Sequence, residues 1–271
     1  MNVKQVVLVA LSFFLAVLAL GALLVPWLPL PPPALQDLAN EYGRPSSEHL
    51  LGTGENGVDL LSQILWGARL SLGVGVLSVA LSSAVGLFLG SIAGYFGGTV
   101  DFFILRIIES FQAFPGILLN VSFAVVLGPS ARNLIIAMAV NSWTSYARVA
   151  RGQALSLRER DFVQAARAMG LTDLKILVRH VWPNLLSPLT VQMTYGMAGA
   201  VLTESTLSFL GLGVPPGTPS WGQLLNQARE VLTTSIHVLL APALAVLFTI
   251  LALNLLGDAL RDWLDPRAGQ G

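Results

Sequence analysis

Long apolar runs restrict what this chain can fold into more than any other feature of its sequence. Six runs approach or exceed the roughly 20 apolar residues that a helix needs to cross a bilayer. They are residues 6–25, 70–94, 103–127, 131–150, 186–210 and 237–257. With 54% apolar and 11% charged residues in a chain of 271, there are too few charges to cover a soluble globule. Because the runs are continuous rather than alternating, the sequence predicts an all-α integral membrane protein with six transmembrane helices.

Basic residues are distributed unequally between the two sides that six spans define. Eleven lie on the side of the termini, and four lie opposite, at Arg44, Arg69, Arg132 and Arg229. Because basic loops remain in the cytoplasm, both termini and residues 151–184 are predicted to be cytoplasmic, and residues 26–69 external. The formal net charge of the chain is zero, and membrane topology explains where its basic residues lie. Nucleic acid is therefore not expected as a partner, whereas the lipid membrane is.

The spans and loops predict three parts of the chain. Residues 1–69 form an N-terminal transmembrane helix with an external segment, residues 70–267 form a five-helix core that includes the 151–184 loop, and residues 268–271 form a tail. Within the core, small residues recur every four positions at Ser82, Gly86, Gly90 and Gly94. This spacing predicts a helix face cleared for close packing against a neighbouring helix.

Motifs for catalysis or nucleotide binding are missing or lack their context. Residues 52–57 match G-x-G-x-x-G, but the strand, helix and downstream acid of a dinucleotide-binding unit do not surround them. The sequence has no G-x-x-x-x-G-K-[ST] phosphate loop and no cysteine. Its three histidines lie outside the apolar runs or near their ends, which argues against an intramembrane protease. We therefore expect no catalytic residue, no metal site and no cofactor bound by this chain.

Residues 151–184 have the pattern of a basic helix-turn-helix. The first helix carries apolar residues at i, i+3, i+4 and i+7, which are Phe162, Ala165, Ala166 and Met169. The second carries Leu174, Leu177, Val178 and Val181 on one face. Gly170 suits the left-handed residue that ends the first helix, and Pro183 is predicted to end the second. The stripe of mostly small side chains predicts a shallow surface on which another protein docks; the alternative is a solvated basic loop.

Two glutamates lie at membrane depth, where a carboxylate is costly and is therefore a functional candidate. Glu109 is one helical turn from Arg106, which favours an ion pair over a substrate contact. Glu204 lies beside Thr203 and Ser205. This polar patch either lines a translocation path or is satisfied across a helix interface.

The loop and four other motifs resemble one family of transport proteins. Gln164-Ala165-Ala166, followed by Gly170 and then by residues 180–184, resembles the "EAA" coupling loop of ABC importer permeases. Residues 49–53, 207–213, 219–222 and 254–267 resemble motifs of the second permease of the dipeptide and oligopeptide transport group. The resemblance covers the chain from about His49 to Arg267.

This resemblance implies a type I ABC importer permease fold in a prokaryotic plasma (inner) membrane. It implies that the chain forms half of the translocation pathway for peptides or a related small solute, together with a homologous permease subunit. Two ATPase subunits that hold ATP and Mg²⁺ would bind the coupling loops, and an external substrate-binding protein would deliver the solute. The residues expected at the ATPase interface are Phe162, Gln164, Ala165, Ala166, Arg167, Met169 and Gly170.

The chain departs from the family pattern at three positions. Gln164 stands where the family has a glutamate at the start of the coupling motif. Gly54 and Val58 stand where the outer motif has an acid and an arginine. Contacts that relatives make through those charges would be absent here. The alternative function is an ion-coupled secondary transporter that uses Glu204 or Glu109, but the sequence shows no inverted repeat with broken helices that would support it.

Overall fold

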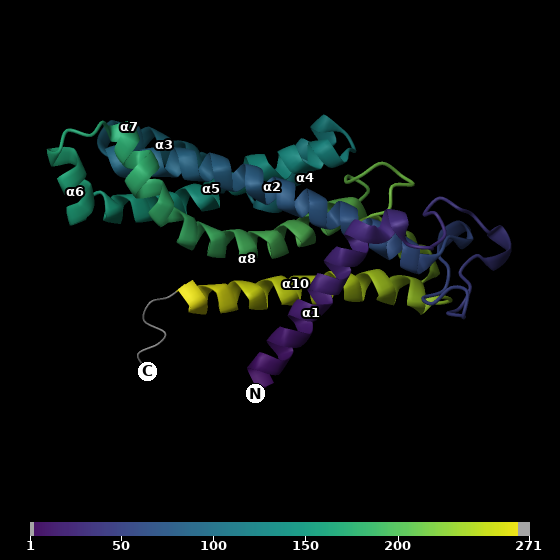
Figure 1. Cartoon of the computed structure of the whole chain (residues 1–271). Coiled ribbons are helices and arrows are strands. Elements are labelled where there is room, and N and C mark those ends of the chain that lie inside the picture. The colour runs from purple at the N-terminus through teal and green to yellow at the C-terminus, as the bar shows by residue number, and fades with distance from the viewer. Residues whose placement is uncertain (1–2, 265–271) are drawn as a thin grey trace. The chain divides into compact units, whose positions relative to one another are not determined.

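The computed structural model describes residues 3–264, and these residues are mostly helical (Figure 1). The α-helices are α1 (Val3–Leu24), α2 (Leu60–Phe96), α3 (Gly98–Gln112), α4 (Gly116–Leu127), α5 (Ala131–Leu157), α6 (Asp161–Ala168), α7 (Asp173–Ile176), α8 (Trp182–Phe209), α9 (Trp221–Ala228) and α10 (Ile236–Leu264). Short turns of 3₁₀-helix are η1 (Val25–Trp27), η2 (Leu38–Asn40), η3 (Glu55–Gly57) and η5 (Arg229–Val231), and η4 (Leu177–Val181) is a π-helix. In place of strands, the described residues contain one isolated bridge between Thr53 and Asp59. The all-α prediction is confirmed, and the predicted 268–271 tail lies outside the described residues.

Four helical segments are long and apolar enough to cross a membrane. They are Val6–Trp27, Leu60–Phe96, Asp173–Phe209 and Ile236–Leu264. These segments contain or overlap the predicted spans 6–25, 70–94, 186–210 and 237–257. The second begins earlier than predicted because Asp59 caps its first turn: its carboxylate accepts the backbone N–H of Ser62 at 2.7 Å.

The prediction of one continuous helix over residues 103–127 is wrong. The run forms α3 and α4, which are bent by 84° at a short break between them. Pro115 lies in this break; it lacks a backbone N–H and disfavours a helical conformation at the residue before it. The Asn141 side chain lies next to the break and donates to the Gly116 carbonyl at 3.3 Å. The bent pair counts as a fifth span only if both helices together cross the membrane.

The predicted span 131–150 forms helix α5, but α5 is too polar to qualify as an apolar span. Several of its polar side chains are bonded within the protein. The guanidinium of Arg151 binds the Asp101 carboxylate at 2.5 and 2.7 Å, and Asn133 donates to the carbonyls of Leu127 and Gly128 at 2.6 and 3.1 Å. Within residues 3–264 the structure therefore supports four or five apolar spans, in place of the six predicted.

Two compact units make up the described chain. The first contains residues 3–77 with Val121–Ile136 and Met197–Leu256, and its core packs apolar side chains around Trp221. The indole of Trp221 is fully buried and donates to the Ile64 carbonyl at 3.1 Å. The second unit contains Ser78–Asn120, Ala137–Gly196 and residues 257–264, with a smaller core of Ile108, Trp143 and Ala147.

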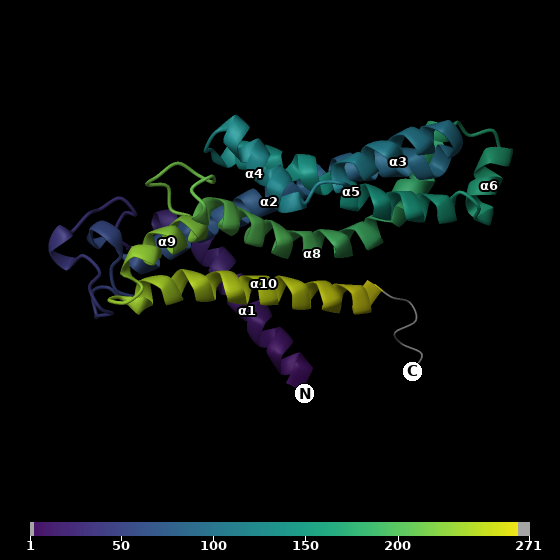
Figure 2. The ribbon, with the colours of Figure 1, turned by 180° about the vertical axis from the view of Figure 1, so that it is seen from behind.

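Within the second unit, the small-residue face of α2 lies directly against α5, and both views of the ribbon show these helices side by side (Figure 2). A Cβ atom at Gly90 would lie 2.2 Å from the Ala147 carbonyl oxygen. Cβ atoms at Gly86 and Gly94 would come within 2.5 Å of Tyr146 and 2.4 Å of the Arg151 carbonyl. Ser82, on the same face, is fully buried and donates to the Ser78 carbonyl at 2.7 Å. Helix α2 can approach α5 this closely only because Gly86, Gly90 and Gly94 have no side chain.

We predict that Gly90→Ala lowers the thermal stability of the purified protein because the added methyl group must displace the α5 backbone. Overpacking of this kind costs about 1–3 kcal/mol. Gly73 is a matched control on the same helix, since a Cβ there meets nothing within 4 Å. Thermal unfolding in detergent should show a lower midpoint for Gly90→Ala than for Gly73→Ala. Equal midpoints would contradict the packing described here.

Candidate functional site

Helices α6 and α7 meet at the corner that the sequence predicts at Gly170. Gly170 has a φ of +78°, and nothing surrounds the position of its missing Cβ, so backbone conformation rather than space requires glycine there. Backbone N–H groups of Gly170 and Leu171 bond to the carbonyls of Arg167 and Ala166 at 3.0 and 3.2 Å. These bonds satisfy carbonyl groups that the end of α6 would otherwise leave free. The chain then turns directly into α7.

The apolar face of α6 differs from the predicted stripe. Val163 and Ala166 are fully buried, whereas Phe162 and Met169 are 42% and 72% exposed. The prediction that Ala166 belongs to the exposed docking surface is therefore wrong. The i, i+3 pair of Val163 and Ala166 packs α6 onto its own chain, and the small side chain of Ala166 fits that contact. Ala165 is exposed, with Phe162 and Met169.

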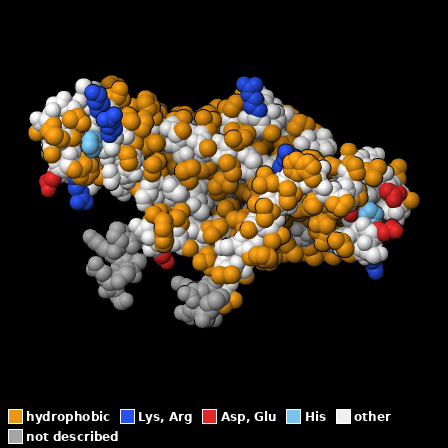
Figure 3. Space-filling view, viewed as in Figure 1, with side chains coloured by type: hydrophobic (Ala, Val, Ile, Leu, Met, Phe, Trp, Pro, Cys, Tyr) orange, Lys and Arg blue, Asp and Glu red, His pale blue; other side chains and the backbone are white. Residues whose placement is uncertain are grey.

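The second helix of the loop also divides its apolar residues between two sides. Ile176, Leu177 and Val181 are buried, whereas Leu174 and Val178 are 69% and 43% exposed. Four large apolar side chains of the loop therefore reach its surface. We call them the exposed apolar face; its members are Phe162, Met169, Leu174 and Val178. Lys and Arg side chains lie on the part of the second unit that carries α6 and α7 (Figure 3).

Pro183 does not end the second helix, contrary to the prediction. The helix continues from Asp173 through the π turn η4 into α8, where Pro183 is the second residue. In η4 the N–H of Trp182 bonds to the Leu177 carbonyl, five residues earlier. A proline in the first turn of a helix is tolerated, and the wider π turn before it accommodates the missing N–H.

Polar contacts join this loop to the last turns of α2. The Trp182 indole donates to the Ser91 hydroxyl at 2.9 Å, and Arg158 donates to the Gly94 carbonyl at 3.4 Å. Arg167 donates to the Tyr95 hydroxyl at 3.2 Å, and this hydrogen bond raises the pKa of the Arg167 guanidinium. The loop is thus held along one face of α2.

Gln164 and Arg167 line an open hollow of about 480 Å³ beside this contact. The other lining residues are Tyr95, Phe96, Arg158, Glu159, Leu171, Thr172 and Asp173. The amide of Gln164 donates to the Arg158 carbonyl at 3.0 Å. A glutamate carboxylate could not donate this bond. The glutamine that stands in place of the family's glutamate therefore has a hydrogen-bond partner within the chain.

The two glutamates at membrane depth have different surroundings. Glu109 forms the predicted ion pair with Arg106, at 2.8 Å. Glu204 is fully buried in the first unit; one of its oxygens accepts from Ser208 at 2.8 Å, and the other has no partner within hydrogen-bond distance among the described residues. Ser205 is also buried, while Thr203 is half-buried and donates to the Gly199 carbonyl at 2.8 Å. A role of these residues in a translocation path stays a prediction.

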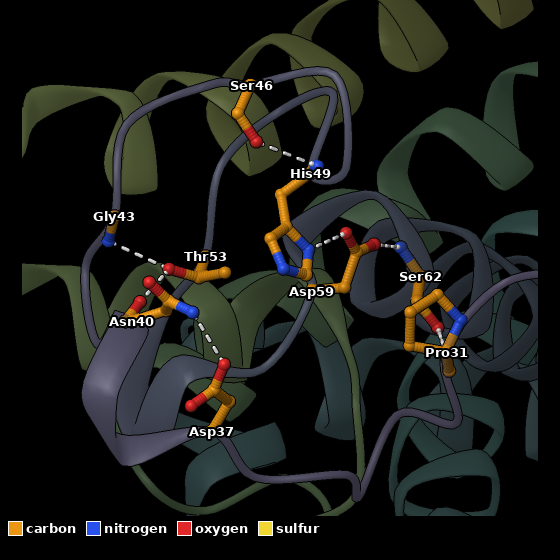
Figure 4. A network of polar contacts seen from close by, with 9 residues as sticks. All are labelled: Pro31, Asp37, Asn40, Gly43, Ser46, His49, Thr53, Asp59 and Ser62. Carbon is orange, nitrogen blue, oxygen red and sulfur yellow. Dashed lines mark hydrogen bonds and ion pairs between the residues drawn. The ribbon is translucent and has the colours of Figure 1, made fainter.

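A polar cluster organises the segment before α2 (Figure 4). His49 contacts the carboxylate of Asp59 at 2.9 Å, and the Ser62 hydroxyl donates to the Pro31 carbonyl at 2.7 Å. The Thr53 hydroxyl accepts the Gly43 N–H at 2.8 Å. The G-x-G-x-x-G string lies in these turns and has no βαβ unit around it, as expected. The cluster itself was not predicted, because turns that bring such residues together carry no periodic signal.

The first unit has a hollow of its own, of about 310 Å³, between residues 55–56 and the region 216–230. Glu55 and Glu230 belong to its lining, together with the side-chain amides of Asn56, Gln223, Asn226 and Gln227. Partial burial, and then the negative charges of Glu41, Glu55 and Glu230, raise the pKa of the nearby Tyr42 hydroxyl. The carboxylates of Glu55 and Glu230 thus come from two segments that are distant in the sequence.

Comparison with known proteins identifies the family. Residues 86–270 match the model of the family described as "Binding-protein-dependent transport system inner membrane component". The chain belongs to this family. The matched residues include the whole 151–184 loop, and the resemblance to ABC importer permeases inferred from the motifs is confirmed.

Curated relatives cover most of the chain. A Brucella suis protein described as a peptide transport system permease is 40% identical over 253 residues, which are 93% of this chain and 85% of that protein. The glutathione transport system permease protein GsiD of Pectobacterium atrosepticum is 42% identical over 223 residues, or 82% and 74% of the two chains. The Escherichia coli GsiD is 40% identical over 97% of this chain and 88% of its own length. The chain is therefore a permease component of a binding-protein-dependent transport system.

The fold is also that of a solved ABC transporter. A chain from the inward-facing methionine ABC transporter MetNI superposes with a TM-score of 0.60 at 18% sequence identity, covering 73% of this chain and 94% of that one. At this identity the likeness concerns the fold alone. The predicted type I ABC importer permease fold is thus confirmed.

We predict that Gly170→Val loosens the corner between α6 and α7, because a β-branched residue is strained by roughly 1–3 kcal/mol at a positive φ. Limited trypsin digestion of the purified protein should cleave the loop faster at its basic residues. Gly152→Val is the control, since Gly152 is helical, lacks a positive φ and has open space at its Cβ position. Equal cleavage of the two variants would show that Gly170 does not set the corner.

Proposed function

We propose that this permease docks on ATPase subunits through the exposed apolar face of its 151–184 loop. The observation that carries the proposal is the exposure of Phe162, Met169, Leu174 and Val178 on a loop that basic side chains flank. Large apolar side chains that gather on a surface are a usual sign of a protein interface. The loop also lies within the residues that match the family model.

The ATPase subunits supply the energy in this proposal. ATP and Mg²⁺ are held by these partners, since this sequence contains no phosphate loop. Movement of the partners on ATP binding displaces α6 and α7. Hydrogen bonds from the loop to Ser91, Gly94 and Tyr95 pass this displacement to α2. A homologous permease subunit forms the other half of the pathway, and rigid-body movements of the attached helices open it to each side in turn.

The orientation in the membrane follows from charge. The four continuous apolar segments, like six spans, leave both termini on one side, and the excess of basic residues at the termini and in the 151–184 loop supports a cytoplasmic location for both. The segment before α2 and helix α9 are then external, where a substrate-binding protein delivers the solute. The relatives named for peptide and glutathione transport support a peptide or a peptide-like compound of similar size as the solute.

We expect Met169→Glu and Leu174→Glu each to reduce copurification of the ATPase subunits at least tenfold, because both place a charge in the proposed apolar contact. A tenfold loss corresponds to about 1.4 kcal/mol. Both residues are largely exposed, so the variants should fold and insert normally. The measurement is the amount of ATPase recovered with the affinity-tagged permease.

Leu50→Glu is the matched control, because Leu50 is 65% exposed but lies in the segment before α2. The Leu50→Glu permease should copurify with the same amount of ATPase as the unmodified chain. Normal recovery with both loop variants would exclude the exposed apolar face as the docking surface.

A further inference from the structure

Tyr95 joins the end of α2 to both helices of the loop. Its hydroxyl donates to the Asp173 carboxylate of α7 at 2.7 Å and accepts from the Arg167 guanidinium of α6 at 3.2 Å. The same guanidinium lies over the Tyr95 ring, 5.6 Å from its centre. One side chain of α2 therefore contacts each of the two short helices that the proposed function places against the ATPase subunits.

The other polar contacts of this part of α2 reach different elements. Ser91 accepts from Trp182, at the start of α8, and the Gly94 carbonyl accepts from Arg158, just after α5. Those contacts hold the two ends of the loop. The hydrogen bonds of Tyr95 hold its middle, where α6 turns into α7.

Folding of the loop does not depend on this hydroxyl. Val163, Ala166 and Ile176 are fully buried and hold α6 and α7 through apolar packing. The ring of Tyr95 is itself only 3% exposed, and a phenylalanine would keep that contact. Asp173 and Arg167 are exposed, so water would replace the lost hydrogen bonds without leaving a buried charge unpaired. The hydroxyl thus restrains α6 and α7 relative to α2 beyond what packing requires.

We propose that Tyr95 is a positioning residue for coupling: its hydroxyl makes α6 and α7 move with α2 when the ATPase subunits bind ATP. This inference rests on the proposed function and gives the Tyr95 junction a distinct part in it: the contacts at Ser91 and Gly94 hold the ends of the loop, and the Tyr95 hydroxyl makes its middle move with α2. Without the hydroxyl, the loop remains docked but slips relative to α2.

The test measures a distance within this chain in the assembled transporter. The sequence has no cysteine, so spin labels can be placed at Leu81 on α2 and at Ala168 on α6, both of which are exposed. Distances are measured by pulsed electron paramagnetic resonance, with cysteine-free partner subunits, in the nucleotide-free complex and after trapping with ATP and vanadate. In the otherwise unmodified chain, we expect one narrow distribution that is the same in both states.

Tyr95→Phe should keep that distribution in the nucleotide-free state and show a second distance population only in the trapped state. Asp173→Ala should behave in the same way, whereas Asp173→Asn, which keeps an acceptor oxygen for the tyrosine, should behave like the unmodified chain. Tyr195→Phe is the matched control, since it removes a 2.5 Å hydrogen bond to Asp258 that does not involve the loop.

Each other outcome overturns the inference. A single unchanged distribution for Tyr95→Phe in the trapped state would show that the hydroxyl transmits nothing. A change already present without nucleotide would show a purely structural role. Loss of ATPase subunits from the Tyr95→Phe complex would make the hydroxyl part of docking rather than of transmission. Failure of the proposed function is distinct, because the unmodified chain would then fail to assemble with ATPase subunits at all.

Discussion

The close approach of α2 to α5 determines where the rest of the second unit can lie. Backbone contacts at Gly86, Gly90 and Gly94 leave no room for side chains, so they fix the register of one helix on the other. Gly94 lies against Arg151, and α5 leads from there into the loop. The residue after Gly94 is Tyr95, which contacts α6 and α7. A shift of one residue in the packing would therefore displace the loop from its contacts with α2.

Much of the fold could be predicted from local patterns. Continuous apolar runs predict spanning helices because an apolar bilayer requires every backbone group to be bonded within its own segment. A glycine after an amphipathic run predicts the corner at Gly170, which has the expected positive φ. The break at Pro115 could have been predicted from the proline itself, but the apolar character of residues 103–127 concealed it. The apolar residues of α5 suggested a membrane span, but the helix also carries polar side chains, and Asn141 and Arg151 are bonded to other parts of the chain.

The site was less predictable because its geometry depends on contacts between distant residues. Alanine is small and apolar, so Ala166 suits a shallow exposed surface and a tight buried contact equally well, and only packing decides between them. Tyr95 and Asp173 are 78 positions apart, and no periodic pattern connects them. Pro183 would end an isolated helix, but the π turn before it lets the helix continue. The sequence also could not show why Gln164 fits its position, because the hydrogen bond that its amide donates to the Arg158 carbonyl depends on the fold of the loop.

The central claim is that the exposed apolar face of the loop contacts an ATPase subunit on the cytoplasmic side. The most direct measurement places a cysteine at Met169, attaches a photoactivatable crosslinker to it and identifies the adduct in membranes that contain the assembled transporter. The account predicts an adduct with the ATPase subunit from position 169 and none from a cysteine at Ser47, in the segment before α2. It also predicts that a membrane-impermeant thiol reagent labels position 47, but not position 169, in intact cells. No ATPase adduct from position 169, or labelling of that position from outside, would contradict the account.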